Sequence, residues 1–485
     1  TQGDQIQHLS FDKLEGKGFF TKEIEEALIA KEIDLAVHSH KDLPTISPAG
    51  LIIAAVSERE DPSELLLINK EAVDLTQKFN LKFKAVVGTS SSRRKSQLLS
   101  FREDIILEEL RGNVPTRIQK LRDKKYDAIM LAAAGVERLN INLDEFQVEK
   151  LSPVEFVPAP AQGVLALQIR ETDKELFDQL QKLNSSEVQK AIAIERRILN
   201  LFDGGCQLPL GVYCKKSGAD YYLWTAKAKS WNSFPLRVSY KLNEEEVRNV
   251  EVTAKKVIEK ITSLKPGKVF ITRDLDESSY FYNALKNHGF EVSGNSLIST
   301  SLVRFSTIPK SDWIFFSSRN AVKYFFEQNP ELGESVKYAV VGKGTESILK
   351  SFGKSASFVG DKTDVKEIGA DFSKVVKNES ILFPQAKDSL QSIQKQLSFS
   401  NKVYDLYTYR TDLKEDFEVP NADIFVFTSP SNVESFFKND SVPSSAKIIS
   451  IGPSTSLSLE RYGVKNYIKP LSFDEVGLAE AVFSI

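Results

Sequence analysis

The chain has 485 residues, of which 41% are hydrophobic and 27% charged, and its formal net charge at pH 7 is −2. This balance is typical of a globular protein and excludes a disordered or fibrous chain. A length far above the ~150 residues of a common domain predicts several folding units. No apolar run approaches the ~20 residues that span a bilayer, and no signal peptide opens the sequence, so we expect a cytoplasmic protein without a membrane segment.

The numbers of cysteines and histidines and the distribution of charge exclude further classes of function. The two cysteines, Cys206 and Cys214, are too few for a disulfide framework, and the four histidines lack the spacing of a metal site, so no metal is expected. The overall charge does not indicate the positively charged surface that nucleic-acid binding requires. Residues 82–138, however, carry thirteen basic and seven acidic residues, a net charge of +6. Part of this excess is a solvated helix face, and the rest suits a polyanionic small molecule.

Short apolar strands alternate with amphipathic helices, a pattern that predicts α/β domains with largely parallel sheets. In chain order we expect a helix at residues 22–30, strands at 33–37 and 85–88, a helix at 115–123, and strands at 127–131 and 164–169. Residues 242–265 are charged and helical, and a new strand follows at 269–272. The Pro266-Gly267 pair between them predicts a linker.

Three motifs of the first half can carry chemistry. Residues 37–44, VHSHKDLP, lie where a strand ends, a common place for a catalytic group, although an aspartate there is more often a cap. Residues 88–94, GTSSSRR, and 110–117, LRGNVPTR, each open a helix with hydroxyl groups or arginines that can converge on an anion. Lone arginines are usually surface residues, but two such helix starts favour binding of carboxylate or phosphate.

A fourth motif surrounds Cys206, in residues 203–209, DGGCQLP. Glycines let a substituent approach the backbone closely, and the proline fixes the exit of the loop. A free cysteine is usually a small buried hydrophobe. A thiol in a Gly-Gly turn favours instead an exposed sulfur to which a group can be attached.

The second half contains an internal repeat. Residues 312–326, DWIFFSSRNAVKYFF, recur 111 positions later as DIFVFTSPSNVESFF, and residues 341–345, VGKGT, recur 110 positions later as IGPST. Two similar lobes are therefore predicted. In each, a strand leads into serines or threonines at a helix start, where free N–H groups and the helix dipole attract anions. These hydroxyl groups also suit ordinary N-caps.

The first half resembles the porphobilinogen deaminase family over residues 1 to about 264. The resemblance rests on residues 1–4 (TQGD), 15–20 (EGKGFF), 38–44 (HSHKDLP), 58–62 (EREDP), 88–94, 110–117 and 204–209 (GGCQLP). It implies two periplasmic-binding-protein-like α/β lobes and a small α+β domain, which join four porphobilinogens with loss of ammonia from each. It assigns to Cys206 a dipyrromethane cofactor held as a thioether, and to Asp42 the stabilisation of a cationic azafulvene and the handling of pyrrole N–H protons.

The same resemblance implies a set of ligand-binding positions. Lys41, Asp42, Ser91, Arg93, Arg94, Gly205 and Cys206 match cofactor-binding positions, and Lys13, Lys17, Ser39, Arg111, Arg117 and Arg138 match substrate-binding ones, with Lys13 and Lys17 on a lid. Two departures are visible. Family members begin with a strand and helix bearing an arginine-and-serine motif that would precede Thr1, and Glu15 stands where glycine is common in the lid.

From residue 269 onward the chain resembles uroporphyrinogen-III synthase, on residues 272–273 (TR), 427–431 (FTSPS) and 451–455 (IGPST). The resemblance implies a two-lobed α/β fold with parallel sheets that closes hydroxymethylbilane with inversion of its last ring. Tyr409 matches the tyrosine proposed to assist departure of the hydroxyl group, with Tyr404 and Tyr407 as neighbouring alternatives. The implied substrate-binding residues are Arg273, Ser317, Ser318, Thr428, Ser429, Ser431, Gly452 and Thr455.

These resemblances predict domain borders and partners. The first deaminase domain takes residues 1–57 and 161–180, the second 58–160, and the third, with the cofactor cysteine, 181–264. The first synthase lobe takes residues 266–302 and 413–485, and the second 303–412. The expected partners are small-molecule substrates only, and the expected state is a monomer. Two alternatives stay open: only the synthase half is active, or the chain is a non-catalytic two-lobed anion-binding protein, which as a solute-binding receptor would need an export signal.

Overall fold

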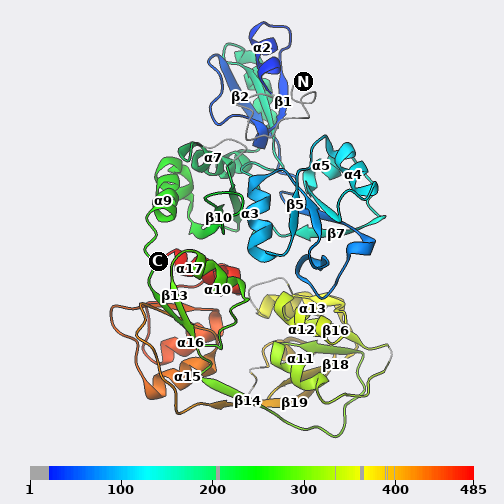
Figure 1. The fold of residues 1–485 in the computed structure, drawn as a ribbon, viewed down its shortest axis with the longest axis vertical. Helices are drawn as coiled ribbons and strands as arrows, with labels where there is room; N and C mark the ends of the chain where they lie inside the picture. Colours follow the sequence, from blue (N-terminus) through cyan, green and yellow to red (C-terminus); the bar gives the residue numbers. More distant parts are fainter. Residues whose placement is uncertain are drawn as a thin grey trace. The chain divides into compact units, whose positions relative to one another are not determined.

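The computed structural model of the chain describes residues 21–203, 208–333, 335–360, 365–387, 389, 391–397 and 399–485. It divides into two compact units, one of Thr1–Lys265 with Phe483–Ile485 and one of Pro266–Val482 (Figure 1). The division falls at the Pro266-Gly267 pair where the sequence predicts a linker. No helix within the described ranges is long and apolar enough to cross a membrane. The borders of the smaller domains stay predictions.

The first sheet of the first unit is small and antiparallel. Its order is β1 (Ala36–Ser39), β8 (Leu165–Arg170) and β2 (Leu51–Val56), with α2 (Lys22–Ile29) and α6 (Lys174–Leu180) packed beside it. The strand expected at 33–37 begins only at Ala36. Before it the chain turns, because Arg170 Nη1 binds the carbonyl oxygens of Leu28 and Ile33 at 2.8 and 2.6 Å. The strand then leads directly into a 3₁₀ turn, η2 (His40–Asp42), which presents Lys41 and Asp42.

The second sheet has five strands in the order β5 (Ile106–Glu108), β4 (Val86–Gly88), β6 (Ala128–Ala132), β3 (Glu64–Asn69) and β7 (Phe146–Leu151). The pairs β5–β4 and β4–β6 are parallel, whereas β3 pairs antiparallel with β6 and β7. Leu66 and Ile68 belong to one hydrophobic cluster, and Leu65 and Leu67 to another. Because side chains alternate along a strand, β3 is buried on both faces of the sheet.

Three helices follow strands of this sheet: α3 (Ser92–Phe101), α4 (Val114–Arg122) and α5 (Ala133–Arg138). Two of them begin as the sequence predicts. Ser91 Oγ accepts a hydrogen bond from Arg94 N at the start of α3, and Asn113 Oδ1 accepts one from Thr116 N at the start of α4, with Pro115 in its first turn. These caps satisfy N–H groups that a helix start leaves unpaired.

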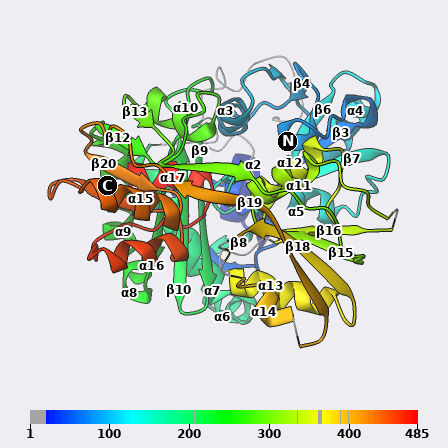
Figure 2. The ribbon, with the colours of Figure 1, turned by 90° about the horizontal axis from the view of Figure 1, so that it is seen from below.

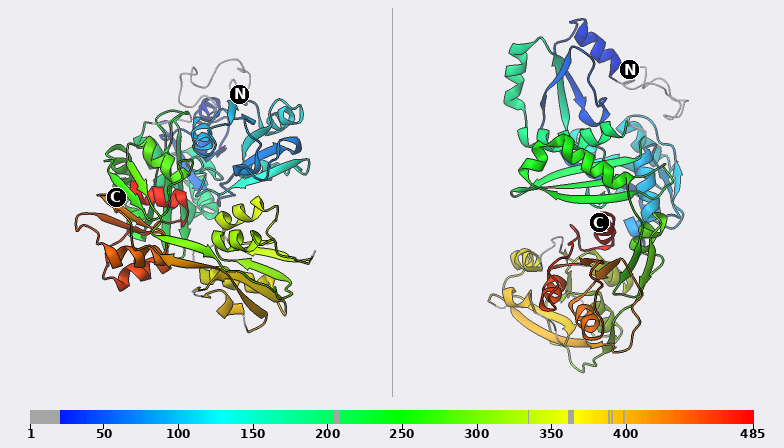
Figure 3. Two further views of the ribbon diagram at one scale, coloured as in Figure 1. Left: turned by 60° about the horizontal axis from the view of Figure 1, so that its bottom comes forward. Right: turned by 90° about the vertical axis from the view of Figure 1, so that its left-hand side faces the viewer.

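The third sheet of the first unit is an antiparallel ribbon of β9 (Leu210–Ser217), β10 (Asp220–Lys227) and β11 (Leu236–Leu242). Helix α7 (Ser186–Leu201) packs against β9 and α9 (Val250–Thr262), and α9 packs against β11, after the short α8 (Glu244–Arg248). The helices lie along the ribbon in the right-hand view of Figure 3. The small α+β arrangement agrees with the fold that the resemblance implies.

The second unit contains two sheets. One is parallel, in the order β13 (Glu291–Gly294), β12 (Lys268–Ile271), β20 (Ile424–Phe427) and β21 (Lys447–Ser450). The other has the order β14 (Ile298–Leu302), β19 (Lys402–Leu413), β18 (Ser380–Ala386), β15 (Trp313–Phe316), β16 (Lys337–Val340) and β17 (Phe358–Val359). Its strands are parallel except for β14. Figure 2 labels four of the parallel strands, β15, β16, β18 and β19. Strands β15 and β20 are buried throughout, as expected for parallel strands covered on both faces.

The sequence repeat forms the same elements twice. Strand β15, α11 (Arg319–Phe326), β16 and α12 (Lys343–Ser351) correspond to β20, α15 (Pro430–Asn439), β21 and α16 (Pro453–Arg461). Ser318 caps α11 through Ala321 N, and Ser429 caps α15 through Asn432 N, at 3.1 and 3.2 Å. The prediction of N-capping hydroxyl groups in both copies is therefore confirmed. The other α-helices in the described part of this unit are α10 (Tyr280–Asn287), α13 (Val365–Val375), α14 (Gln394–Leu397) and α17 (Glu475–Phe483).

Candidate functional site

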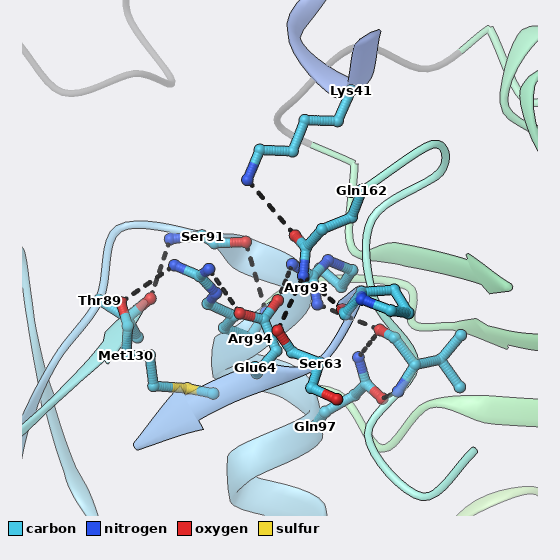
Figure 4. A network of polar contacts seen from close by, with 12 residues as sticks. Lys41, Ser63, Glu64, Thr89, Ser91, Arg93, Arg94, Gln97, Met130 and Gln162 are labelled. Carbon is cyan, nitrogen blue, oxygen red and sulfur yellow. Dashed lines mark hydrogen bonds and ion pairs between the residues drawn. The ribbon is translucent and has the colours of Figure 1, made fainter. Parts of the chain in front are cut away.

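A buried carboxylate organises the two arginines that the sequence assigns to an anion. Glu64, at the start of β3, is 0% exposed, and its two oxygens accept hydrogen bonds from Arg93 Nη2 and Arg94 Nη2, each at 2.6 Å (Figure 4). Each arginine also binds a backbone oxygen, Arg93 that of Val157 and Arg94 that of Met130. The guanidinium groups are therefore rigidly placed before any ligand binds.

Sequence reasoning missed Glu64. A signal existed, because a carboxylate inside a strand of buried leucines is rare unless a cation pairs with it. The two arginines hold the pKa of Glu64 down at about 2 against the opposite effect of burial. This carboxylate is therefore ionised at any physiological pH.

Lys41 and Asp42 reach the same place from η2. Lys41 Nζ lies 3.4 Å from Gln162 Oε1, and Gln162 Nε2 donates to the carbonyl oxygen of Pro62 at 2.8 Å (Figure 4). Burial lowers the pKa of Lys41. The Asp42 carboxylate acts in the opposite direction and raises this pKa, and the Arg94 guanidinium group lowers it. Asp42 itself is exposed at the end of the turn. The side chain of Gln162, like that of Glu64, is a part of this site that the sequence did not indicate.

Arg117, from α4, completes the group. Its Nε donates to the carbonyl oxygen of Gly112 at 2.7 Å, and its pKa is lowered to about 10 by burial and by Arg94, with Asp42 acting in the opposite direction. The cluster of Lys41, Asp42, Glu64, Arg93, Arg94 and Arg117 thus contains four cations and two carboxylates. Its excess of positive charge favours ligands with further carboxylates.

The resemblance implies a dipyrromethane cofactor with acetate and propionate groups, which needs hydrogen-bond donors for its carboxylates. Arg94 Nε is buried with no hydrogen-bond partner in the described part of the chain. A buried donor of this kind is costly unless a ligand or water satisfies it. An unsatisfied guanidinium donor beside excess positive charge fits a carboxylate-bearing cofactor. In the ranges that the structure describes, no group of three or more histidine, cysteine, aspartate or glutamate side chains gathers as a metal site requires.

The other predicted deaminase positions differ in their exposure and in their hydrogen-bond partners, and some lie outside the described residues. Ser91 is the N-cap of α3, Ser39 is exposed at the end of β1, and Arg111 is half-buried ahead of α4. Arg138 Nη2 donates to the carbonyl oxygen of Gly163 at 2.9 Å, so this guanidinium holds a backbone turn. Lys13, Lys17, Gly205 and Cys206 lie outside the described residues.

Replacing Glu64 by glutamine is expected to lower the free energy of unfolding by about 3–5 kcal/mol, because two buried guanidinium groups lose their counter-charge. The pH dependence follows from the lowered pKa. The ordinary value is 4.5 and the folded value about 2, so the stabilisation is fully present above pH 4.5 and lost as pH falls through 2. Urea unfolding of the wild type and of Glu64→Gln between pH 7 and pH 2 measures both. Equal stability at pH 7 would contradict the prediction.

In the second unit, Tyr409 is fixed by Ser318. The two hydroxyl oxygens are 3.1 Å apart, and the Tyr409 ring stacks on Tyr324 with centroids 5.4 Å apart. Burial raises the pKa of Tyr409, while the hydrogen bond between its hydroxyl group and that of Ser318 lowers it. Tyr407, on the same strand, is 43% exposed. Tyr409 is therefore a protonated hydroxyl group held at the start of α11.

The remaining predicted synthase residues differ in solvent exposure and in whether their side chains are already paired. Arg273 is paired with Glu475, from Nη2 to Oε1 at 2.8 Å, and Thr428 Oγ1 donates to the carbonyl oxygen of Thr272 at 2.7 Å. Thr455 is 1% exposed inside the start of α16, and Gly452 is its N-cap residue. Ser317 is exposed, and Ser318, Thr428, Ser429 and Ser431 are half-buried.

Comparisons with known proteins cover both halves. The family described as porphobilinogen deaminase, dipyromethane cofactor binding domain, matches residues 1–178, and the family described as uroporphyrinogen-III synthase HemD matches residues 298–480. The chain is 44% identical over 220 residues to the porphobilinogen deaminase of Bacillus subtilis, covering 45% of this chain and 68% of that protein. It is 45% identical over 214 residues to the deaminase of Brevibacillus brevis, covering 44% of this chain and 67% of that protein.

Among solved structures, uroporphyrinogen-III synthetase from Helicobacter pylori covers 45% of this chain and 98% of its own, with 16% identity and a TM-score of 0.35. The assignment of the second half rests on the family match at residues 298–480. The assignment of the first half rests on the family match at residues 1–178 and on its curated relatives. The chain belongs to the porphobilinogen deaminase family and carries a uroporphyrinogen-III synthase domain on the same polypeptide.

Proposed function

We propose that the two halves act in succession. The first joins four porphobilinogens into hydroxymethylbilane with release of ammonia, and the second closes the bilane to uroporphyrinogen III with inversion of its last ring. Both families are present in the chain, which supports this order of reactions. The observation that carries the deaminase role is the cluster of four cations around two carboxylates, one of which, Asp42, is exposed.

The residues divide the deaminase chemistry between them. Dipyrromethane, when bound through Cys206, supplies the pyrrole carbon to which the first substrate is joined. Arg93, Arg94, Lys41 and Arg117 bind carboxylates of cofactor and growing chain. The Asp42 carboxylate stabilises the cation left when ammonia departs and accepts a pyrrole N–H proton. Glu64 keeps the two arginines apart and oriented, so that they need no rearrangement when the ligand arrives.

In the synthase half we propose Tyr409 as the donor that assists departure of the bilane hydroxyl group. A tyrosine whose pKa is raised stays protonated, and the bond to Ser318 orients its hydroxyl group. The hydroxyl groups at the starts of α11 and α15 and the Arg273 side chain suit the carboxylates of the bilane. A monomeric state, a cytoplasmic location and the absence of nucleic-acid partners stay predictions.

The full chain supplied with porphobilinogen alone is expected to form uroporphyrinogen III. Unaided bilane closes without inverting its last ring, so chromatographic separation of the type I and type III isomers distinguishes catalysis from background. Type I alone would contradict the synthase role of the second half. No tetrapyrrole from porphobilinogen, together with type III from added hydroxymethylbilane, would contradict deaminase activity in this chain.

Tyr409→Phe is expected to slow formation of the type III isomer by about a hundredfold, the usual size of a lost proton donor. Hydroxymethylbilane is supplied directly, so that the deaminase half does not limit the rate. Tyr407→Phe, on the same strand but 43% exposed, is the matched control. A slower reaction in Tyr407→Phe with normal rates in Tyr409→Phe would contradict the assignment of Tyr409.

A further inference from the structure

The segment that carries Lys41 and Asp42 is held by one arginine from outside the sheet. Arg196, on α7, donates from Nη1 to the carbonyl oxygen of His40 at 2.8 Å and from Nη2 to that of Leu43 at 3.2 Å. Nη2 also contacts the carbonyl oxygen of Pro44. One guanidinium group therefore spans residues on both sides of Lys41 and Asp42.

The segment has few bonds of its own. Its described backbone bonds are one from His40 N to the carbonyl oxygen of Val164 at 2.9 Å and one from Leu43 N to the carbonyl oxygen of His40 at 3.3 Å. Past His40, the turn lies outside the strand ladder that fixes β1. The five N–H donors of arginine are spread over a planar group and suit several carbonyl oxygens at once, whereas the three donors of lysine all start from one nitrogen atom.

A second contact comes from the same face of α7. Asn200, one turn after Arg196, donates from Nδ2 to Thr45 Oγ1 at 3.0 Å. Residues four apart on a helix lie on one face, so α7 contacts the segment at two successive levels. In the sequence, Cys206 follows the last residue of α7, Leu201, by five positions. One helix thus contacts the Asp42 segment and leads into the residues that contain the cofactor cysteine.

We propose that Arg196 is a positioning residue for deamination, which fixes the backbone of residues 40–44 so that the Asp42 carboxylate meets the reacting pyrrole. This inference rests on the proposed role of Asp42. A displacement of about 1 Å at a reacting group lowers rates by up to about a hundredfold. The buried His40 side chain stays neutral because burial and Arg196 lower its pKa to about 3, so no second charge competes at the carbonyl oxygens.

The test is a double-mutant cycle in the full chain with Arg196→Gln and Asp42→Asn. Arg196→Gln should lower kcat for porphobilinogen consumption at least tenfold, with KM within about threefold of wild type and the cofactor mass still attached. In the Asp42→Asn background the same change should lower kcat no further, because the group that Arg196 positions has already lost its charge. An equal fall in both backgrounds, or a rise in KM alone, would overturn the proposal.

Two further variants separate positioning from folding. Arg102 is a matched control, since its guanidinium group donates to the carbonyl oxygens of Lys78, Leu81 and Lys82 in the same unit. Arg102→Gln should lose stability but keep kcat, and a kcat loss equal to that of Arg196→Gln would overturn the proposal. Arg196→Lys keeps the positive charge and serves as the test variant if Arg196→Gln does not fold. It should lower kcat by less than the tenfold expected for Arg196→Gln, with KM unchanged. Wild-type activity in Asp42→Asn contradicts the role of Asp42, whatever Arg196 does.

Discussion

Cys206→Ser is expected to lose the covalent dipyrromethane and all deaminase turnover, while the synthase half keeps its activity on added hydroxymethylbilane. A thioether requires a thiol, and a serine hydroxyl group is a far weaker nucleophile than a thiolate. Intact-mass analysis of the purified full chain should show extra mass on the wild type that is absent from the variant. An unmodified wild-type mass together with turnover of porphobilinogen would contradict the role of Cys206.

The second cysteine provides the control for this experiment. Cys214, on β9, is 2% exposed, and burial raises the pKa of its thiol, an effect that Glu195 reinforces. A buried thiol with a raised pKa is inert. Cys214→Ser should therefore retain both the extra mass and the turnover. Loss of the mass in Cys214→Ser alone would move the attachment site to β9.

The sequence predicts local features of the deaminase site well, because these depend on neighbouring residues. The motifs at residues 88–94 and 110–117 predict helix starts, and α3 and α4 begin within them, with Ser91 and Asn113 as their N-caps. The repeat of the second half likewise predicts two copies of one strand-helix pattern, with capped helices in each. Helix starts and caps depend on a few consecutive residues, so a single sequence is enough to predict them.

Pairings across the fold were not predictable in the same way. Glu64 meets Arg93 and Arg94 across 29 and 30 positions of sequence, and its importance depends on burial that only packing creates. Arg196 binds the carbonyl oxygen of His40 across 156 positions, and a backbone oxygen leaves no mark on residue type. The late start of β1 has the same origin, since the carbonyl oxygens of Leu28 and Ile33 are held by Arg170 far along the chain.

The role of Asp42 is the assignment on which the deaminase mechanism depends most. A carboxylate that acts on a cation formed during the reaction contributes little to binding of the neutral-ring substrate. Lys41, Arg93, Arg94 and Arg117 remain in Asp42→Asn, so carboxylates of cofactor and substrate still find their partners. The variant should therefore carry the cofactor mass and a KM close to that of the wild type.

Asp42→Asn is expected to lower kcat for porphobilinogen by about a hundredfold or more, because the lost interaction exists mainly in the transition state. Asp34→Asn is the matched control, because Asp34 precedes β1, which the Asp42 turn follows, and 81% of its side chain is exposed. Its Oδ1 lies 2.5 Å from Arg170 Nη2, and neither residue belongs to the cluster. Arg170 keeps its hydrogen bonds to the carbonyl oxygens of Leu28 and Ile33, and an ion pair whose carboxylate is exposed contributes little to stability, so this variant should match the wild type. Steady-state release of ammonia at saturating porphobilinogen measures both. Equal kcat for Asp42→Asn and wild type would refute the catalytic role, because the remaining cations could then carry out the reaction without a carboxylate beside the substrate.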